Sequence, residues 1–422
     1  MNIKINELID STRAKFGLDN YYLKRHSLSR KLNILNETVY FLEMEWFPNH
    51  VEEQEEEELN PEGTAVIELD INSLRYERVI FVGDISYANG FRFTEVNRDT
   101  VVNWIEQETG LSYGKHFKLH KEENGEFNFE ACFEDIYFSP SGHIKVIVDH
   151  NGNLTLYSKH GLFPPNEMIK KEVYTLSLES IEHLAWKQLK LLNFPSFESE
   201  QLIPVYGVEE IYVTNEQKSV IPLDFNKDMR PLEINKPIYW DEPNLKPFER
   251  QELKLSWDVT IEQAISNEQS PDSFPISKAE EEKCIVGVTE FLRQVYSNET
   301  GNWTLKTLHR DQGYIHAILR LNQEDTKCVF HRKLMIIFDA KSLQAINYMD
   351  NQPFIDQFGH FSCSEEVLVN KNEAYQKIKD HFELTPRYVF DSQQNKYILC
   401  GLLDCHYGVR ASSGDIISLN DL

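Results

Sequence analysis

One short pattern recurs along the chain and constrains its fold more than any other feature: a strand, a tight turn and a second strand. The clear copies are 66–77 (VIELDINSLRYE), 146–157 (VIVDHNGNLTLY), 335–346 (MIIFDAKSLQAI) and 407–417 (YGVRASSGDII), with a weaker copy at 211–221 (IYVTNEQKSVI). Each has β-branched or aromatic residues, then a polar residue, then Ser, Asn or Gly. The pattern predicts a repeated β-hairpin.

The first turn position differs between the copies. It holds Asp70, Asp149, Thr214, Asp339 and Arg410 in chain order. An aspartate there caps the turn through its own side chain, so we interpret the three aspartates as structural caps. Gly152 and Gly414 permit positive φ in two turns. Leu74 and Leu343 replace this glycine in two others, so we expect those two turns to have a different geometry.

Most copies follow a segment whose apolar residues recur every three to four positions, which is typical of a helix. We expect helices at 5–16, 101–108, 177–192, 277–295 and 370–382. The fourth begins with a capping box formed by Ser277 and Glu280. Between helix and turn lie alternating strands such as 127–138 and 313–320, which suit antiparallel sheets with one face on the helix.

The predicted fold class is therefore α+β, built from tandem small modules in which an antiparallel sheet packs against one helix. We predict six consecutive segments: module 1 at 1–90, module 2 at 91–165, a partial module 3 at 166–225, a proline-rich connector at 226–276, module 4 at 277–355 and module 5 at 356–422.

Composition limits the classes of partner. The 422 residues carry a formal net charge of -25, and such a chain repels nucleic-acid phosphates and anionic lipids. We therefore predict no nucleic-acid binding and no membrane insertion. The acidic block 52–58 (EEQEEEE) is interpreted as a solvated loop, with a weak cation site as the alternative.

The expected compartment is the cytoplasm. The first 20 residues lack the apolar core of a signal peptide, and no apolar run approaches the roughly 20 residues that span a bilayer. Six scattered cysteines without a C-x-x-C pair suggest free thiols in a reducing environment. Export would require that a leader had been removed.

The unit ending in a "V-D-A-x-[S/T]-G-x-[I/V]" turn resembles PepSY-type domains. Residues 409–417 (VRASSGDII) and 338–346 (FDAKSLQAI) carry this resemblance. Several such units in tandem, over roughly two thirds of the chain, resemble the bacterial YcdB/YcdC-type repeat proteins. The resemblance implies non-catalytic domains that accompany protease propeptides and envelope proteins and bind or restrain peptidases. Thr214 and Arg410 depart from the family's usual aspartate.

Two polar clusters could carry chemistry. His116 and His120 would share a face and could bind zinc on a helix, but on the strand expected here they lie about 13 Å apart. Cys400, Asp404, Cys405 and His406 could supply a nucleophile or metal ligands. On a strand, Cys405 and His406 point to opposite faces, so we interpret the segment as a buried strand with apolar thiols.

A third cluster joins His309, His316 and His331 with Cys328 and Asp311, and we interpret it as structural. Aromatic residues along one strand region suit packing of a helix on a sheet, with a binding groove as the alternative: Phe127, Phe129, Phe133, Tyr137 and Phe138. The sequence holds no G-x-S-x-G, P-loop, G-x-G-x-x-G or H-E-x-x-H motif. We therefore assign no catalytic, cofactor-binding or metal-binding residue and expect no cofactor.

The leading hypothesis is a non-catalytic protein that binds a protein or peptide, with a peptidase as the partner that the family resemblance implies. Binding would use strand addition at a sheet edge or a cleft between modules, and the sheet face away from each helix is expected to be free. Two alternatives stay open: a hydrolase with an unrecognised site, and a scaffold or immunity-type protein whose acidic face meets a basic partner. The sequence does not determine the oligomeric state.

Overall fold

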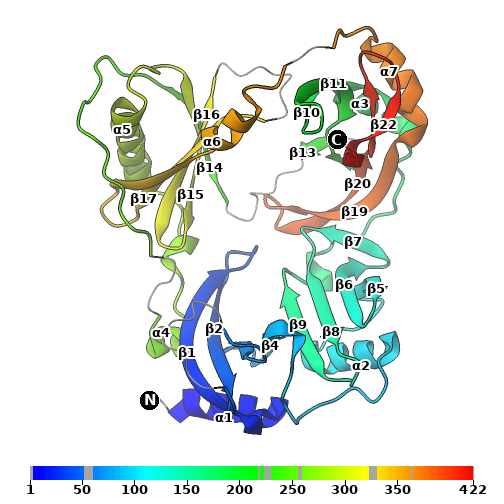
Figure 1. The fold of residues 1–422 in the computed structure, drawn as a ribbon, viewed down its shortest axis with the longest axis vertical. Helices are drawn as coiled ribbons and strands as arrows, with labels where there is room; N and C mark the ends of the chain where they lie inside the picture. The colour runs from blue at the N-terminus through cyan, green and yellow to red at the C-terminus, as the bar shows by residue number, and fades with distance from the viewer. Residues whose placement is uncertain are drawn as a thin grey trace. The chain divides into compact units, whose positions relative to one another are not determined.

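The computed structural model describes residues 3–51, 60–216, 219–222, 230–254, 259–322, 330–362 and 365–421. The chain has an α+β fold and forms two compact units, each assembled from separate stretches (Figure 1). Unit 1 comprises 1–171, 256–273 and 387–398, and unit 2 comprises 172–255, 274–386 and 399–422. Among the described residues, no helix has the length and apolar character needed to cross a membrane.

Unit 1 contains two sets of one helix and four antiparallel strands. The first set is α1 (Ile3–Phe16), β1 (Tyr21–Leu32), β2 (Thr38–Pro48), β3 (Ala65–Asp70) and β4 (Tyr76–Phe81). The second set is α2 (Arg98–Thr109), β5 (Phe117–Glu123), β6 (Glu126–Phe133), β8 (His143–Val148) and β9 (Leu154–His160). The last strands of the two sets pair with each other, giving the order β1-β2-β3-β4-β9-β8-β6 with β5 on β6.

The β4–β9 pairing makes one continuous sheet from the two sets. Val79 lies opposite Tyr157, and each stands four residues after the residue that closes its own turn, Arg75 or Asn153. The two sets therefore meet through equivalent positions. One apolar core joins both helices to this sheet, and it includes Ile9 of α1 and Ile105 of α2. Residues 259–264, around α4 (Ile261–Ser266), add Ala264 to the same core.

Unit 2 contains a third set of the same order, here called the α5 set. It is formed by α5 (Lys278–Val295), β15 (Trp303–Asp311), β16 (Tyr314–Leu321), β17 (Lys333–Asp339) and β18 (Ala345–Asp350). The capping box at its start is confirmed, because Ser277 Oγ accepts the N–H of Glu280 while the Glu280 carboxylate accepts the N–H of Ser277. Its core includes Val288, Phe291 and Phe338.

The expected connector 226–276 is in part regular structure. Its residues Leu232–Ile238 form β14, which pairs with β15 and gives the order β14-β15-β16-β17-β18. Pro237 suits this place because β14 is an edge strand, where a missing backbone N–H breaks no ladder bond. The prolines led us to predict a connector over the whole of 226–276, although part of this segment is a strand.

The rest of unit 2 interleaves the regions assigned to modules 3 and 5. Its helices are α3 (Leu178–Gln188), α6 (Gln352–Ile355) and α7 (Lys371–Ile378). Its strands include β10 (Leu189–Ser196), β11 (Gln201–Val208), β12 (Ile211–Thr214), β13 (Val220–Pro222), β21 (Tyr407–Arg410) and β22 (Ile416–Ser418). β11 pairs with β21, and α3 and α7 share one core. The module borders themselves stay predictions.

Two expected elements end earlier than the sequence pattern predicted. The helix expected to reach 192 ends at Gln188, because the alternating apolar run that follows forms β10. The strand expected over 127–138 breaks at Glu134 and Asp135, which adopt positive φ, and resumes as β7 (Ile136–Ser139).

The hairpin β19 (Glu383–Asp391) and β20 (Lys396–Asp404) places Arg387 beside Tyr137 of β7.

The expectation of a different geometry at Leu74 and Leu343 is wrong. Both adopt φ of 57°, the left-handed conformation that Gly414 adopts at 79°. In all three turns this residue donates its N–H to the carbonyl of the first turn residue, at 2.9, 2.8 and 2.8 Å. The leucines therefore accept a conformation that is costly for residues with a Cβ instead of changing the turn.

The aspartate caps are confirmed. Asp70 Oδ1 accepts the N–H groups of Asn72 and Ser73, and Asp339 Oδ1 accepts those of Lys341 and Ser342. These backbone donors lower the pKa of Asp339. The same cap recurs at Asp391, between β19 and β20, so it belongs to a kind of hairpin rather than to a binding site.

Candidate functional site

The two histidines of the first cluster, His116 and His120, contact different residues. His116 precedes β5, and its Nδ1 accepts the N–H of Ser112 at 2.9 Å. His120 lies in β5, with its Nδ1 3.6 Å from Glu130. Across the described ranges, no group of three or more His, Cys, Asp or Glu side chains could hold a metal ion.

The cysteines near residue 400 are buried, and the neighbouring histidine is exposed. Cys405 Sγ lies 3.4 Å from the carbonyl oxygen of Tyr407, and burial raises the pKa of its thiol. The imidazole of His406 lies 3.5 Å from Asp404 instead. A raised pKa opposes the thiolate that a nucleophile requires, so this cluster has no arrangement for thiol catalysis.

His309 and His316 form a cross-strand pair with ring centroids 5.0 Å apart. His309 is 6 % exposed, and its Nε2 has no hydrogen-bond partner among the described residues. Burial, with a smaller effect from the charge of His316, lowers the pKa of His309 to about 4. His331 and Asp311 lie elsewhere in this set, before β17 and at the end of β15, and Cys328 lies outside the described residues.

The aromatic residues of the 127–138 region fill cores. Phe127 and Phe129 belong to the core of unit 1, and Phe133 and Phe138 pack against Tyr388. The Arg387 guanidinium lies over Tyr137, 5.1 Å from its ring centre. These contacts favour the packing interpretation of the segment over a binding groove.

The sheet faces away from the helices differ from expectation. In the first set this face carries ion pairs: Arg25 with Glu45 at 2.7 Å, and Lys31 with Glu68 at 3.1 Å. In the α5 set, the corresponding face is buried at His309 and Ile337. The expected free face therefore carries ion pairs in the first set and is partly buried in the α5 set.

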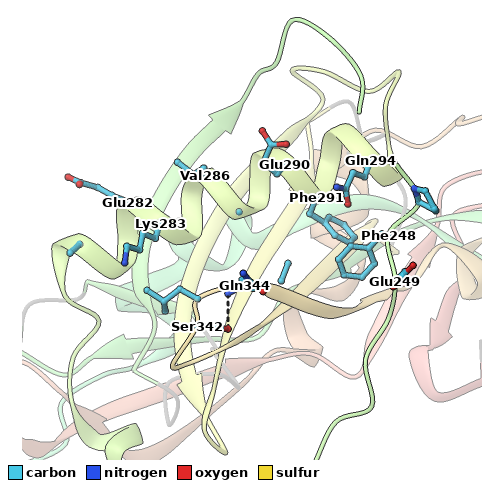
Figure 2. A pocket seen from close by; sticks show the side chains of 15 residues that line it. Phe248, Glu249, Glu282, Lys283, Val286, Glu290, Phe291, Gln294, Ser342 and Gln344 are labelled. Carbon is cyan, nitrogen blue, oxygen red and sulfur yellow. Dashed lines mark hydrogen bonds between the residues drawn. The ribbon is translucent and has the colours of Figure 1, made fainter. Parts of the chain in front are cut away.

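The α5 set has a groove of about 940 Å³ beside α5 (Figure 2). One wall is the flank of α5 from Ala279 to Gln294, and the other is formed by 247–249 and 342–345. The apolar side chains of this α5 groove come from both walls: Phe248, Ala279, Val286, Phe291, Leu343 and Ala345. Val286 leaves 63 % of its surface exposed there.

Local packing fixes the positions of the two walls of the groove. A Cβ at Gly287 would lie 2.5 Å from the Phe338 ring, so glycine lets α5 approach the sheet closely. Phe248 packs on Phe291, with ring centroids 4.8 Å apart, at the end of the groove near Gln294 (Figure 2). The segment carrying Phe248 is anchored by Gln251, whose N–H donates to the Ile346 carbonyl at 2.8 Å.

The charged groups of the α5 groove are mainly acidic: Glu249, Glu282, Lys283 and Glu290. Glu290 pairs with Arg293 at 2.6 Å. Glu249 and Glu282 have no ion-pair partner within the described part of the chain. Lys283 is likewise unpaired there, so two uncompensated carboxylates and one ammonium group border the apolar walls. The net negative charge favours a ligand with apolar and basic groups.

Sequence reasoning missed this groove. The α5 pattern identified the buried stripe that includes Cys284, Val288 and Phe291. Val286 and Gly287 lie off that stripe, and an apolar residue beside a mid-helix glycine was the available signal. The contribution of Phe248 could not be read from the pattern, because it comes from a segment 30 or more residues away in sequence.

No family model and no curated protein matches the chain. Among solved structures, the Bacillus megaterium YpeB C-terminal domain is similar over 82 % of this chain and 96 % of that chain, at 7 % sequence identity and a TM-score of 0.25. A likeness at this level carries no argument about function.

Proposed function

We propose that the protein is a non-catalytic binding protein whose α5 groove holds an apolar segment of a protein partner that also carries basic residues. The observation that carries this proposal is the exposed Val286 in a groove of net negative charge, where the unpaired carboxylates of Glu249 and Glu282 outnumber the unpaired Lys283. Apolar burial supplies most of the binding free energy, about 25 cal/mol per Å² removed from water. The carboxylates select the charge of the partner and speed its association.

The family resemblance adds a narrower form of this proposal. In it the sets are PepSY-like modules, the partner is a peptidase and the location is cytoplasmic. The recurrence of one helix and a four-stranded meander in three places supports this form. The hydrolase alternative has no comparable support, since Cys405 and His406 do not converge and burial raises the pKa of the Cys405 thiol.

A direct test uses the full chain and two labelled synthetic peptides with the same leucine-rich apolar face, one flanked by lysines and one by glutamates. Fluorescence anisotropy should show binding of the lysine peptide at least about tenfold tighter, because a tenfold preference needs only about 1.4 kcal/mol. The preference should shrink in high salt, which screens exposed charges.

A matched pair of variants assigns the binding to the groove. Val286→Glu places a charge on the apolar α5 wall of the groove and should abolish binding. Val173→Glu makes the same change at a residue that is 83 % exposed and outside the groove lining, and should leave binding unchanged. Equal binding by the two variants, or no preference between the peptides, would refute the proposal.

A further inference from the structure

The turns of two sets can be compared residue by residue, because both have the same length and the same hydrogen bonds. In the first set, Asp70 begins the β3–β4 turn, Leu74 is left-handed and Arg75 closes it. In the α5 set, Asp339, Leu343 and Gln344 hold these positions. Gln344 thus stands where the first set has Arg75.

In unit 1, this turn is covered by the end of a helix. Arg75 Nη1 donates to the carbonyl oxygens of Glu108 at 2.6 Å and Gln107 at 3.3 Å, near the last residue of α2. Carbonyls in the last turn of a helix have no partner within the helix, so Arg75 supplies one. Lys15, next to last in α1, pairs with Glu108 at 2.6 Å. The second set therefore places its helix C-terminus on the turn of the first.

In the α5 set, the corresponding turn faces the groove. Residues 342–345 line it together with Gln294, which is next to last in α5 as Lys15 is in α1. The backbone N–H of Gln344 donates to Ser342 Oγ (Figure 2), whereas its side-chain amide has no hydrogen-bond partner among the residues that the structure describes. The surface that holds a helix end in unit 1 is thus present here with an available donor.

We propose that the α5 groove receives the C-terminal end of an α-helix from a protein partner. This inference rests on the proposed function and names the element bound. The Gln344 amide donates to the last carbonyls of that helix, as Arg75 does to those of α2. Basic residues are favoured in the last turn of a helix by the macrodipole, and there they meet Glu249 at one end of the groove or Glu282 at the other (Figure 2). The bound element is therefore apolar on one side and carries Lys or Arg at its C-terminal end.

A second copy of this chain fits the groove poorly. Two α5 grooves brought together would place surfaces of the same net charge against each other, because the unpaired Glu249 and Glu282 outnumber the unpaired Lys283 in each copy. Like charges juxtaposed at an interface cost several kcal/mol as an order of magnitude. The charge around the groove therefore favours a different, basic partner over self-association.

Three peptides of one composition test the inference on the full chain. The first is a stabilised amphipathic helix with lysines in its last turn, and the second has the lysines in its first turn. The third has the sequence of the first, except that a terminal proline is exchanged with a residue at the centre of the helix. The first should bind about tenfold tighter than either of the others, since proline breaks the helix and the second peptide reverses the charges against the dipole.

Gln344→Glu separates hydrogen bonding from charge. Glutamate has nearly the same shape but no donor, and it adds a negative charge. If Gln344 donates to helix carbonyls, binding of the first peptide weakens about tenfold, whereas a site that responds to charge alone binds the lysine peptide more tightly. Gln393→Glu, on an exposed turn outside the groove, is the control and should change nothing.

The outcomes distinguish the two proposals. Equal binding of the three peptides, or tighter binding by Gln344→Glu, overturns the helix-end inference while binding that still depends on Val286 sustains the proposed function. If none of the peptides binds in a manner that Val286→Glu abolishes, both fail. A dimer in sedimentation that Val286→Glu dissociates would make a second copy the occupant and overturn the choice of partner.

Discussion

The first two sets of unit 1 and the α5 set have the same order of helix and strands but differ in what their last strand meets. β4 pairs with β9, whereas β18 is the edge of its sheet. Lys15 pairs with Glu108 at the junction of the first two sets. Glu282 of α5 has no ion-pair partner among the described residues. The junction pairs these charges within the chain, whereas the α5 set leaves the Glu282 carboxylate unpaired.

This difference shows where to look for binding in a chain built from similar pieces. A set that joins a neighbour buries the flank of its last strand, and its turn contacts are used within the chain, as with Arg75 and α2. A set that stands alone keeps the same flank open. The open copy of an internal junction is then the best candidate for a binding surface, because its geometry already suits a protein neighbour.

The largest effect should come from the tyrosines at equivalent positions of the two last strands. Tyr157 is fully buried at the junction, with its ring 5.1 Å from Trp104, whereas Tyr348 is half-buried against Phe291. Tyr157→Ala should lower the free energy of unfolding by about 3–5 kcal/mol and Tyr348→Ala by about half as much. Urea denaturation with hydrogen exchange to locate the change measures both.

Tyr157→Phe serves as the control for this comparison. The hydroxyl of Tyr157 is buried without a hydrogen-bond partner among the described residues, so its removal should cost nothing and can stabilise by up to about 1 kcal/mol. A loss of stability as large as that of the alanine variant would show that the hydroxyl, and not the ring, holds the junction.

Two cross-strand histidine pairs give the next prediction. Burial lowers the pKa of both His309 and His160, the latter stacked on His143 at 5.1 Å. The folded pKa of His309, about 4, lies below the ordinary value of 6.5, so the unfolded chain binds more protons between these values. Stability is complete above pH 6.5 and is lost as the pH falls toward 4, by about 1.4 kcal/mol per pH unit at most.

The measurement is the free energy of unfolding from pH 7 to 4 for the wild type and two variants. His309→Gln should flatten this pH dependence clearly, while His160→Gln should flatten it less because His160 is exposed at the end of β9. An unchanged slope in His309→Gln would mean that the His309 imidazole has the same pKa in the folded and the unfolded chain.

Much of the local structure could be predicted from the sequence. Capping residues such as Ser277 and the period of apolar residues located helices, and Asp339 and its neighbours located turns, because these depend on residues close in the chain. The pairing of β4 with β9 could not be predicted, since it joins residues about 80 positions apart and both strands read as ordinary hairpin arms. The strand β14 was missed because Pro237 is a strong local signal against a strand. Proline is compatible with a strand at the edge of a sheet, and the edge position depends on pairing that is distant in sequence.

The candidate site was less predictable than the fold. Histidine and cysteine drew attention because they are reactive, yet Cys405 and His309 owe their state to burial, which a sequence does not state. The groove is lined by residue types without special reactivity, such as Val286, Phe248 and Gln344. It is a candidate site because no neighbouring element of the described chain fills the groove that they line. Such a surface is recognised only by comparison with the covered copy of the same turn.

The smallest effect tests the left-handed leucines. Leu74 is 56 % exposed, so Leu74→Gly relieves an unfavourable φ at little cost in packing. The flexibility of glycine in the unfolded chain offsets part of this gain, leaving a net stabilisation of about 0.5 kcal/mol. Leu343 has the same φ but packs against the core of the α5 set, so Leu343→Gly should be neutral or destabilising. Denaturation midpoints that rise equally for both would show that Leu343 adds no packing, and the apolar wall it forms in the α5 groove would then be free to rearrange around a ligand.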